Sequence, residues 1–254
     1  MNALDRLRPI GLQELVEQAA MQTRVDRKYV LPVADAERLV AALTGRARVL
    51  DIEGTREFAY ESVYFDTAEL TSYRLAAHRR RRRFKVRTRL YVDSAECWLE
   101  VKTRGARGHT LKNRLPYAFD HRRTIDPGRD FVAGVLAGER IPPVGAALAP
   151  VLVTRYRRAT LFLPATGSRV TVDVGLAWES TTGRRLGLPG VAVVETKTGS
   201  TASAADRLLW TLGHRPVRMS KFATGLAALH PDLPATPWWR TLRRHFPRPE
   251  GMST

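Results

Sequence analysis

Alternation of charged and apolar residues in steps of two is the clearest pattern in the chain, and it is strongest between Arg83 and Arg114. Successive side chains of a β-strand point to opposite faces of a sheet, so each run here predicts a strand with one apolar and one charged face. The residues expected on the charged face are Lys85, Arg87, Arg89, Lys102, Lys112 and Arg114. Two such cations about 8 Å apart repel by roughly 2 kcal/mol at an effective dielectric of about 20. The face is therefore tolerable if it is solvated, and favourable only if a polyanion lies across it.

The same strand and helix periodicities predict about eight strands and several helices along the 254 residues. Besides the three strands within 83–117, we expect strands at 23–32, 57–66, 151–163, 168–174 and 191–199. We expect helices at 9–22, 33–45, 67–77, 127–140 and 204–213. The basic end of the chain, which contains proline and tryptophan, is expected to be loosely ordered. No repeat or linker divides the sequence, so the predicted organisation is an N-terminal helix at 1–21, one domain at 22–230 and a tail at 231–254.

Charged residues cannot pack against one another in a dry core, which constrains how these strands are arranged. The arrangement that satisfies them is an α+β fold: a closed or nearly closed antiparallel β-barrel tunnel of about eight strands, with ionic side chains inside and helices packed on the apolar outside. From the rest of the chain, the interior would receive Lys28, Arg158, Arg169, Lys197 and Lys221, with the carboxylates Asp26, Glu61, Glu100, Asp173 and Glu195. In the strand at 151–163, either Tyr156 and Arg158 or Arg155 and Arg157 would point inward. The alternative is that all these residues form ordinary solvated strand faces.

The net charge of +17, from 42 lysine and arginine residues against 25 aspartate and glutamate residues, implies an anionic partner. Nucleic acid, anionic lipid and a phosphorylated small molecule all fit this charge. With 44% hydrophobic residues, the chain is long enough to bury a core. It has no run of about 20 apolar residues, no apolar N-terminal signal segment and a single cysteine, Cys97. We therefore expect a cytoplasmic protein without a transmembrane segment.

The expected interior has the chemistry of a phosphate site. Arginine forks suit bidentate contact with phosphate oxygens, and lysine supplies point charges. One or two carboxylates beside bound phosphates form a hard oxygen site for Mn²⁺ or Mg²⁺. The basic run Arg79–Arg83 is either a solvated loop or a mouth that attracts polyanions, and the pair Trp238 and Trp239 either packs internally or contacts a membrane or partner. The histidines lack metal-ligand spacing, and no glycine-rich phosphate loop is present.

Nine short segments, taken in order, also resemble one known family. They are RVDRKYV, SVYFDTAEL, RFKVRTRLY, LEVKTR, LKNRLPY, TRYRRATLF, RVTVDVGL, VVETKTG and MSKFATG. Together they are similar to the VTC domain, the catalytic polyphosphate polymerase module of the vacuolar transporter chaperone complex, which belongs to the triphosphate tunnel metalloenzyme superfamily. The resemblance covers roughly residues 22–230. It implies a tunnel of antiparallel strands, in agreement with the barrel expected from the alternation.

The resemblance implies roles for individual residues. Those implied to be catalytic are Lys28, Arg87, Arg89, Lys102, Lys112, Arg158, Arg169 and Lys221. Those implied to make further substrate contacts are Lys85, Arg114, Tyr156, Lys197 and Arg218. Arg218 stands where the family commonly has lysine. Glu195 resembles the metal-binding glutamate, and the match of Tyr156 and Arg158 to the family's YxR favours their pointing inward.

The activity implied by the resemblance is that of a metal-dependent phosphotransferase, which moves the γ-phosphate of ATP to a growing inorganic polyphosphate chain with Mn²⁺ or Mg²⁺ as cofactor. The implied partners are ATP and inorganic polyphosphate or phosphate, with no specific nucleic acid and with a peripheral membrane or membrane-protein contact left open. Eukaryotic members carry an SPX sensor domain and membrane helices, which are not found in this sequence. Two other functions stay open: a tunnel-fold triphosphatase that delivers water, and a non-catalytic module that binds polyphosphate or nucleic acid.

Overall fold

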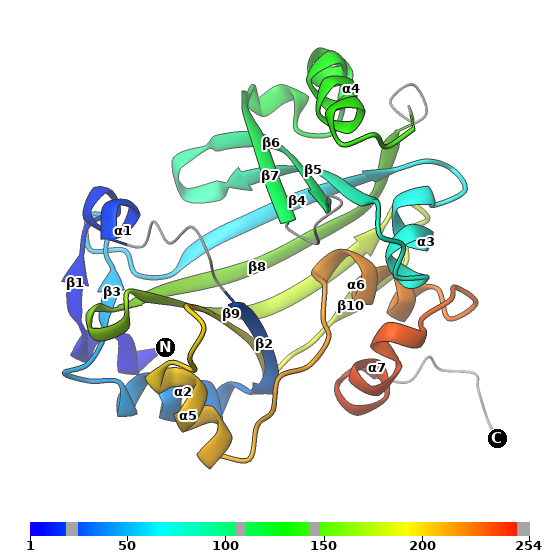
Figure 1. Ribbon diagram of the computed structural model, residues 1–254. Coiled ribbons are helices and arrows are strands. Elements are labelled where there is room, and N and C mark those ends of the chain that lie inside the picture. Colours follow the sequence, from blue (N-terminus) through cyan, green and yellow to red (C-terminus); the bar gives the residue numbers. More distant parts are fainter. Residues whose placement is uncertain (19–24, 105–109, 143–147, 248–254) are drawn as a thin grey trace. The chain divides into compact units, whose positions relative to one another are not determined.

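The computed structural model describes residues 1–18, 25–104, 110–142 and 148–247 (Figure 1). Its strands are β1 (Arg8–Ile10), β2 (Val25–Pro32), β3 (Arg48–Leu50), β4 (Phe58–Asp66), β5 (Arg83–Tyr91), β6 (Glu96–Arg104), β7 (Thr110–Tyr117), β8 (Ala149–Leu163), β9 (Ser168–Ser180), β10 (Arg185–Gly187) and β11 (Val191–Thr198). Its helices are α1 (Leu12–Gln18), α2 (Val33–Ala42), α3 (Thr71–Ala77), α4 (Arg129–Gly138), α5 (Ala204–Thr211), α6 (Lys221–Leu229) and α7 (Trp239–His245).

Hydrogen bonds join eight strands into a sheet in the order β2-β11-β9-β8-β4-β5-β6-β7. The pairs β2–β11, β11–β9, β4–β5, β5–β6 and β6–β7 are antiparallel. Three short strands join this path at its side, with β3 pairing with β8 and β1, and β10 pairing with β9. The α+β class, with an antiparallel sheet of about eight main strands and helices packed on it, is confirmed.

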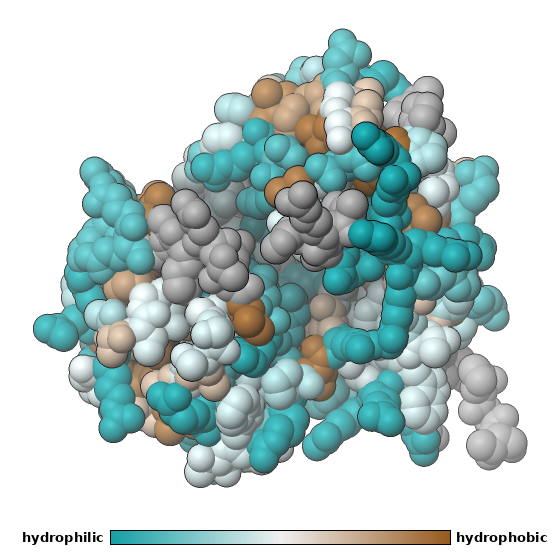
Figure 2. Space-filling model, viewed as in Figure 1, coloured by the Kyte–Doolittle hydropathy of each residue, from teal (hydrophilic) through white to brown (hydrophobic). Residues whose placement is uncertain are grey.

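The chain forms two compact units. The first unit comprises Met1–Phe58, Tyr156–Leu176 and Leu188–Arg218, and the second comprises Ala59–Arg155, Ala177–Gly187 and Met219–Thr254. The long strands β8 and β9 contribute residues to both units. The domain boundaries expected at 21 and 230 stay predictions. Hydrophilic residues are spread over the face seen in Figure 2, as the high charge of the chain leads one to expect.

In the first unit, two helices cover one face of the strands. Tyr29 of β2 and Val194 of β11 lie in one buried cluster with Leu39 of α2 and Leu209 of α5. Each such leucine stabilises the fold by about 1.5–3 kcal/mol relative to an exposed position. Helix α5 begins with a capping box, because the Ser203 hydroxyl accepts from a backbone N–H three residues on and that residue's carboxylate accepts from the Ser203 N–H. The alternate residues of β2 and β11 are left on the opposite face of the sheet.

The second unit repeats this arrangement with another helix. Phe84 of β5 and Leu99 of β6 share a buried cluster with Val132 and Leu136 of α4. Residues on β5 and β6 that alternate with these apolar side chains lie on the other face. In both units, therefore, the two-residue period separates an apolar face covered by helices from a face that carries the charges.

The ends of the chain differ from expectation. The helix predicted at 9–22 is shorter and follows the short strand β1, and residues 19–22 of that prediction lie outside the described residues. The tail is not loosely ordered as far as residue 247, because Trp238 is buried and α7 follows it. Two aromatic contacts, Trp238 with Tyr73 and Trp178 with Phe246, tie this segment to the second unit. Among the described helices, none has the length and apolar character needed to cross a membrane.

Candidate functional site

Three lysines lie side by side across the second unit. The antiparallel register pairs Lys85 of β5 with Lys102 of β6, and Lys102 with Lys112 of β7. Directly paired residues on one face have Cβ atoms about 4.5–5.5 Å apart, and like charges at that distance are destabilising. A row of three such cations therefore destabilises the fold when no anion is bound. It becomes favourable when a polyanion lies along it.

A buried glutamate lies beside this row. Glu100 of β6 accepts hydrogen bonds from Nε and Nη2 of Arg87 at 2.8 and 2.6 Å, and Lys112 Nζ lies 2.5 Å from its other oxygen. Arg89 Nη1 is 3.9 Å from the same oxygen as Lys112. Glu100 is 1% exposed, so its carboxylate has lost most of its hydration. The ion pairs with these cations offset the free energy of that desolvation. We call Arg87, Arg89, Glu100, Lys102 and Lys112 the Glu100 cluster.

Protonation in the Glu100 cluster follows from this crowding of charge. Burial raises the pKa of Glu100, but the charges of Arg87, Arg89 and Lys112 outweigh it and hold that pKa far below its usual value. Repulsion from Arg87, together with burial and the charge of Arg89, lowers the pKa of Lys102 well below its usual value. The surrounding cations thus favour the ionised form of Glu100, whereas the ammonium form of Lys102 is disfavoured until another negative charge binds nearby.

Two buried polar atoms of β4 and β5 on this face have no hydrogen-bond partner among the described residues. They are Nε of Arg89 and the hydroxyl of Ser62, whose residues are paired across β4 and β5. Tyr64 lies on the same face and its hydroxyl accepts from Nη1 of Arg87 at 2.9 Å. The sequence analysis missed Ser62 and Tyr64 as site residues. Their position two apart on β4, on the side facing Arg87 and Arg89, was the available signal.

The SKF segment lies against this face as well. Ser220 caps α6, and its hydroxyl accepts a hydrogen bond from Lys85 Nζ at 2.8 Å. Phe222 stacks on Tyr64 with ring centroids 5.0 Å apart. Lys221 is half-buried at the first position of α6, and its carbonyl accepts from the indole of Trp178 at 2.7 Å. The predicted residues Lys85 and Lys221 are therefore brought to the same part of the second unit as the Glu100 cluster.

Two predicted residues are more peripheral. Arg114 of β7 is exposed and its guanidinium lies 4.4 Å from the centre of the Trp98 ring, although its register position opposite Glu100 places it on the charged face. Arg218, in the first unit, is also exposed.

A second ionic group lies on the corresponding face of the first unit. Glu195 of β11 is paired in register with Lys28 of β2, whose Nζ is 3.7 Å from the carboxylate. Lys197 Nζ donates to Glu195 and lies 3.2 Å from Asp26. Arg169 of β9 is half-buried in register with Lys197. We call Asp26, Lys28, Arg169, Glu195 and Lys197 the Glu195 cluster.

On β8, Arg158 and Arg155 lie on opposite faces of the sheet. Arg158 donates to both oxygens of Asp173 on β9, at 2.6 and 2.8 Å, and lies 5.3 Å from the ring centre of buried Tyr156. Arg155 instead pairs with Glu61 at 2.8 Å. The expectation that Glu61 faces the other ionic residues is wrong. Its register partner is an apolar residue of β5, Leu90, which places Glu61 on the helix-covered side of the sheet.

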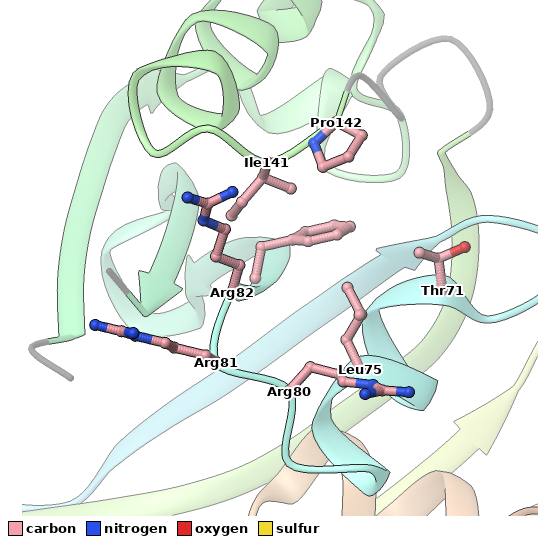
Figure 3. A pocket seen from close by; sticks show the side chains of 8 residues that line it. Thr71, Leu75, Arg80, Arg81, Arg82, Ile141 and Pro142 are labelled. Atoms are coloured by element: carbon pink, nitrogen blue, oxygen red, sulfur yellow. The ribbon is translucent and has the colours of Figure 1, made fainter. Parts of the chain in front are cut away.

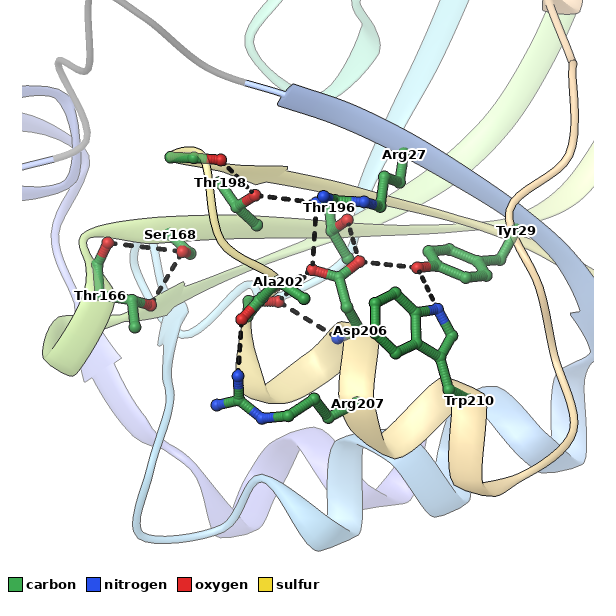
Figure 4. Close-up of polar contacts among 12 residues, drawn as sticks. Arg27, Tyr29, Thr166, Ser168, Thr196, Thr198, Ala202, Asp206, Arg207 and Trp210 are labelled. Carbon is green, nitrogen blue, oxygen red and sulfur yellow. Dashed lines mark hydrogen bonds and ion pairs between the residues drawn. The ribbon is translucent and has the colours of Figure 1, made fainter.

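Behind the Glu195 cluster, on the opposite face of the same strands, a buried hydrogen-bond network joins β2, β11 and α5 (Figure 4). Asp206 Oδ1 accepts from the hydroxyls of Tyr29 at 2.7 Å and Thr196 at 2.6 Å, and its other oxygen accepts from Ser203. Tyr29 and Thr196 are sequence neighbours of the paired residues Lys28 and Glu195. The network therefore holds the two strands together directly behind that pair.

The Glu195 cluster contains oxygen ligands suited to a divalent ion. No group of three histidine, cysteine, aspartate or glutamate side chains forms a metal site in the part of the chain that is described. Mg²⁺, however, commonly binds one or two carboxylates together with substrate phosphates and water. Glu195 and Asp173 lie on one face of neighbouring strands, since Asp173 is paired with Val193. Burial raises the pKa of Glu195, but Lys28, Lys197 and Arg158 outweigh it and keep the carboxylate ionised. These donors fit Mn²⁺ or Mg²⁺ held jointly with phosphate.

One protein-family model and several solved structures match the chain. The sequence model of the VTC domain matches residues 23–127 and 144–230. No curated protein matches the chain. A candidate adenylate cyclase from Bacillus halodurans is a structural relative, with a TM-score of 0.51 at 15% identity over 78% of this chain and 94% of that one, which shows a shared fold.

Two other solved structures are less similar. A candidate adenylyl cyclase from Hippeastrum with a dominant triphosphatase activity has a TM-score of 0.47 at 16% identity, over 80% of this chain and 94% of that one. A protein of Pyrococcus horikoshii OT3 has a TM-score of 0.46 at 14% identity, over 80% of this chain and 98% of that one.

Proposed function

Because the chain belongs to the VTC domain family, we propose that it is a metal-dependent phosphotransferase that lengthens inorganic polyphosphate with the γ-phosphate of ATP. The observation that carries the proposal is the in-register row of Lys85, Lys102 and Lys112. Like charges at this spacing repel one another, and a linear polyanion would compensate them along the whole row. A chain of phosphates is such a ligand.

In this proposal, the residues of each cluster bind phosphoryl oxygens. Arg87 and Arg89 offer planar forks for bidentate contact, whereas Lys102 and Lys112 offer point charges. An incoming phosphate competes with Glu100 for these cations and raises the pKa of Lys102, so binding is accompanied by proton uptake at its Nζ. In the Glu195 cluster, Lys28, Arg169 and Lys197 supply the cations, and Arg158 of β8 adds a further one.

The reaction itself needs positioning and charge stabilisation more than a protein nucleophile. An oxygen of phosphate or of the polyphosphate end attacks the γ-phosphorus of ATP, the bond from that phosphorus to the β,γ-bridging oxygen breaks, and ADP leaves with the electron pair. The attacking oxygen is already anionic, so no general base is required. Arginine and lysine side chains stabilise the charge on the transferred group and on the leaving ADP.

A divalent ion fits this scheme at Glu195. Glu195, with Asp173 as a neighbour on the same sheet face, would hold Mn²⁺ or Mg²⁺. When bound, the ion neutralises negative charge on the phosphates. Lys28 and Lys197 would then exchange part of their contact with Glu195 for contact with phosphate oxygens.

Incubation of the purified protein with ATP and Mn²⁺ tests the proposal. We expect long-chain polyphosphate, resolved on a gel, together with ADP. Orthophosphate as the sole phosphate product would instead identify a triphosphatase. Binding of polyphosphate without turnover, and with an affinity that falls as salt rises, would identify a non-catalytic module.

Glu195→Gln provides the residue-level test of the metal assignment. We expect turnover to fall at least 100-fold, while binding of inorganic triphosphate in the absence of metal is retained, because the cations of both clusters remain. Glu37→Gln, which changes an exposed glutamate of α2, is the matched control and should leave turnover unchanged. Full activity of Glu195→Gln would contradict the metal role.

A further inference from the structure

A separate pocket lies in the second unit, outside both ionic clusters (Figure 3). It has a volume of about 650 Å³, which is within the range of small-molecule sites. Its apolar wall contains Leu75, Phe84 and Ile141, and its charged residues are Arg80, Arg81 and Arg82. In Figure 3, Arg82 extends toward Ile141, whereas Arg80 lies beside Leu75.

Both walls of this pocket are fixed by well-formed helix ends. At the end of α3, Arg79 is in the left-handed conformation (φ 53°), and the N–H of Arg80 donates to the carbonyl of Leu75 at 2.9 Å. At the end of α4, Arg140 adopts the same conformation, and the N–H of Ile141 donates to a carbonyl in the last turn at 3.0 Å. These are Schellman-type caps, which usually place glycine at that position. The cap at the end of α3 therefore fixes the backbone conformation where the basic run starts, at Arg79 and Arg80.

The charge of the pocket is not explained by its local structure. A cation near the C-terminal end of a helix is favourable because of the helix dipole, but that accounts for one arginine and not for three in succession. None of the described lining residues carries a carboxylate, and no carboxylate of the described residues pairs with Arg80 or Arg82. The charge is thus concentrated around an apolar hollow, where an anion would be attracted.

We propose that this pocket binds a small phosphorylated molecule that also carries an apolar or aromatic group. The phosphate contacts the guanidinium groups of Arg80 and Arg82, whose planar forks match its oxygens. The apolar group occupies the hollow beside Leu75, Phe84 and Ile141. Either a soluble phosphate ester or the head and proximal chain of an anionic lipid supplies this combination.

Three soluble probes test the phosphate contact and the apolar contact separately. They are 1-naphthyl phosphate, inorganic phosphate and 1-naphthol. We expect 1-naphthyl phosphate to bind to the whole protein and to perturb NMR signals of Leu75 and Ile141, and each of the other two probes to bind at least tenfold more weakly there. The double variant Arg80→Gln/Arg82→Gln should weaken 1-naphthyl phosphate at least tenfold. The control Arg6→Gln/Arg46→Gln removes the same charge from exposed positions of the first unit and should have no effect.

Vesicles distinguish the source of the ligand. Sedimentation with vesicles that contain phosphatidic acid, compared with phosphatidylcholine alone, identifies a lipid if it depends on Arg80 and Arg82. Binding of 1-naphthyl phosphate that depends on them identifies a soluble ester. If neither depends on these arginines, or if inorganic phosphate binds as well as 1-naphthyl phosphate, the proposal is wrong. Because no probe requires ATP turnover, these outcomes are independent of the proposed polymerase activity.

Discussion

At the scale of single residues, the fold places Lys102 where the positively charged form of its side chain is disfavoured. It lies between two other lysines in register, and Arg87 and burial lower its pKa well below the usual value. The folded protein therefore binds fewer protons at this side chain than the unfolded chain does. As a result, the unfolding free energy rises with pH from the lowered pKa of Lys102 up to about 10.4, the ordinary lysine value.

Lys102→Met should consequently stabilise the free protein and weaken its hold on phosphate. Removing one like charge from the row should raise the unfolding free energy by roughly 0.5–1 kcal/mol at neutral pH. The rise in stability between neutral and alkaline pH should be smaller than in the wild type. Urea titrations across this pH range measure both effects, and inorganic triphosphate binding measures the functional cost. Arg46→Met is the control, and an equal stabilisation by it would argue against repulsion within the row.

At the scale of secondary-structure elements, α5 is tied to two strands by one carboxylate. Asp206 accepts hydrogen bonds from Tyr29, Thr196 and Ser203, and the last two lie on different sides of the turn that joins β11 to α5. Burial raises the pKa of Asp206, but its hydrogen bonds outweigh that effect and lower the pKa below the usual value. Asp206 thus contributes stability at neutral pH that declines as pH falls below about 4, the ordinary aspartate range.

Asp206→Asn should destabilise the protein by about 2–3 kcal/mol, because it removes the charge from several buried hydrogen bonds. Its unfolding free energy should also fall less steeply on acidification than that of the wild type. Denaturant titrations at several pH values test this expectation. Asp232→Asn, at an exposed aspartate after α6, should behave like the wild type. A variant at position 206 with unchanged stability would show that the network adds nothing to the fold.

Helix α6 approaches the sheet closely at one glycine. A Cβ atom on Gly225 would lie 2.2 Å from the Trp178 ring, whereas a Cβ on Gly138 of α4 would meet nothing within 4 Å. Gly225→Ala should therefore destabilise the protein by roughly 1–3 kcal/mol, because the indole or the helix must move. Gly138→Ala should be neutral or slightly stabilising. Thermal unfolding of the two variants tests the difference, and a neutral Gly225→Ala would mean that Trp178 moves freely.

The sequence pattern predicted the charged faces of β5, β6 and β7 because charged residues recur at every second position along much of each strand. The pattern was misleading on β4, where aromatic residues lie on both faces and the carboxylate of Glu61 does not mark the polar side. The Asp206 network was also missed, because it joins residues 177 positions apart and leaves no periodic signal. Strands of three residues, such as β1 and β3, are too short for alternation to identify them.

At the scale of the whole molecule, lysine and arginine are used differently. The chain contains six lysines, and the remainder of its 42 cationic residues are arginine. All six lysines, namely Lys28, Lys85, Lys102, Lys112, Lys197 and Lys221, are among the predicted site residues. Reagents that acylate amines should therefore modify these six lysines and the N-terminal amine, and leave the arginine side chains unmodified.

We expect Lys102 to react faster than the other lysines at neutral pH, since a lowered pKa exposes the nucleophilic amine. Inorganic triphosphate should slow its modification, because a bound anion restores the ammonium form. Peptide mass spectrometry after brief treatment with acetic anhydride measures the rate at each lysine. Sodium chloride at equal ionic strength is the control. Uniform rates at the six lysines, with no effect of triphosphate, would contradict this view of the site.

The separation of an apolar face from a charged face along β5 also affects how the protein can evolve. A saturation mutagenesis screen of β5 can score protein abundance and turnover separately. We expect substitutions at successive positions to lower abundance and turnover in turn. Phe84 and Val86 would limit abundance, whereas Lys85 and Arg89 would limit turnover. A lineage could then exchange one phosphate substrate for another by substituting every second residue, while the interior that holds its shape is inherited unchanged.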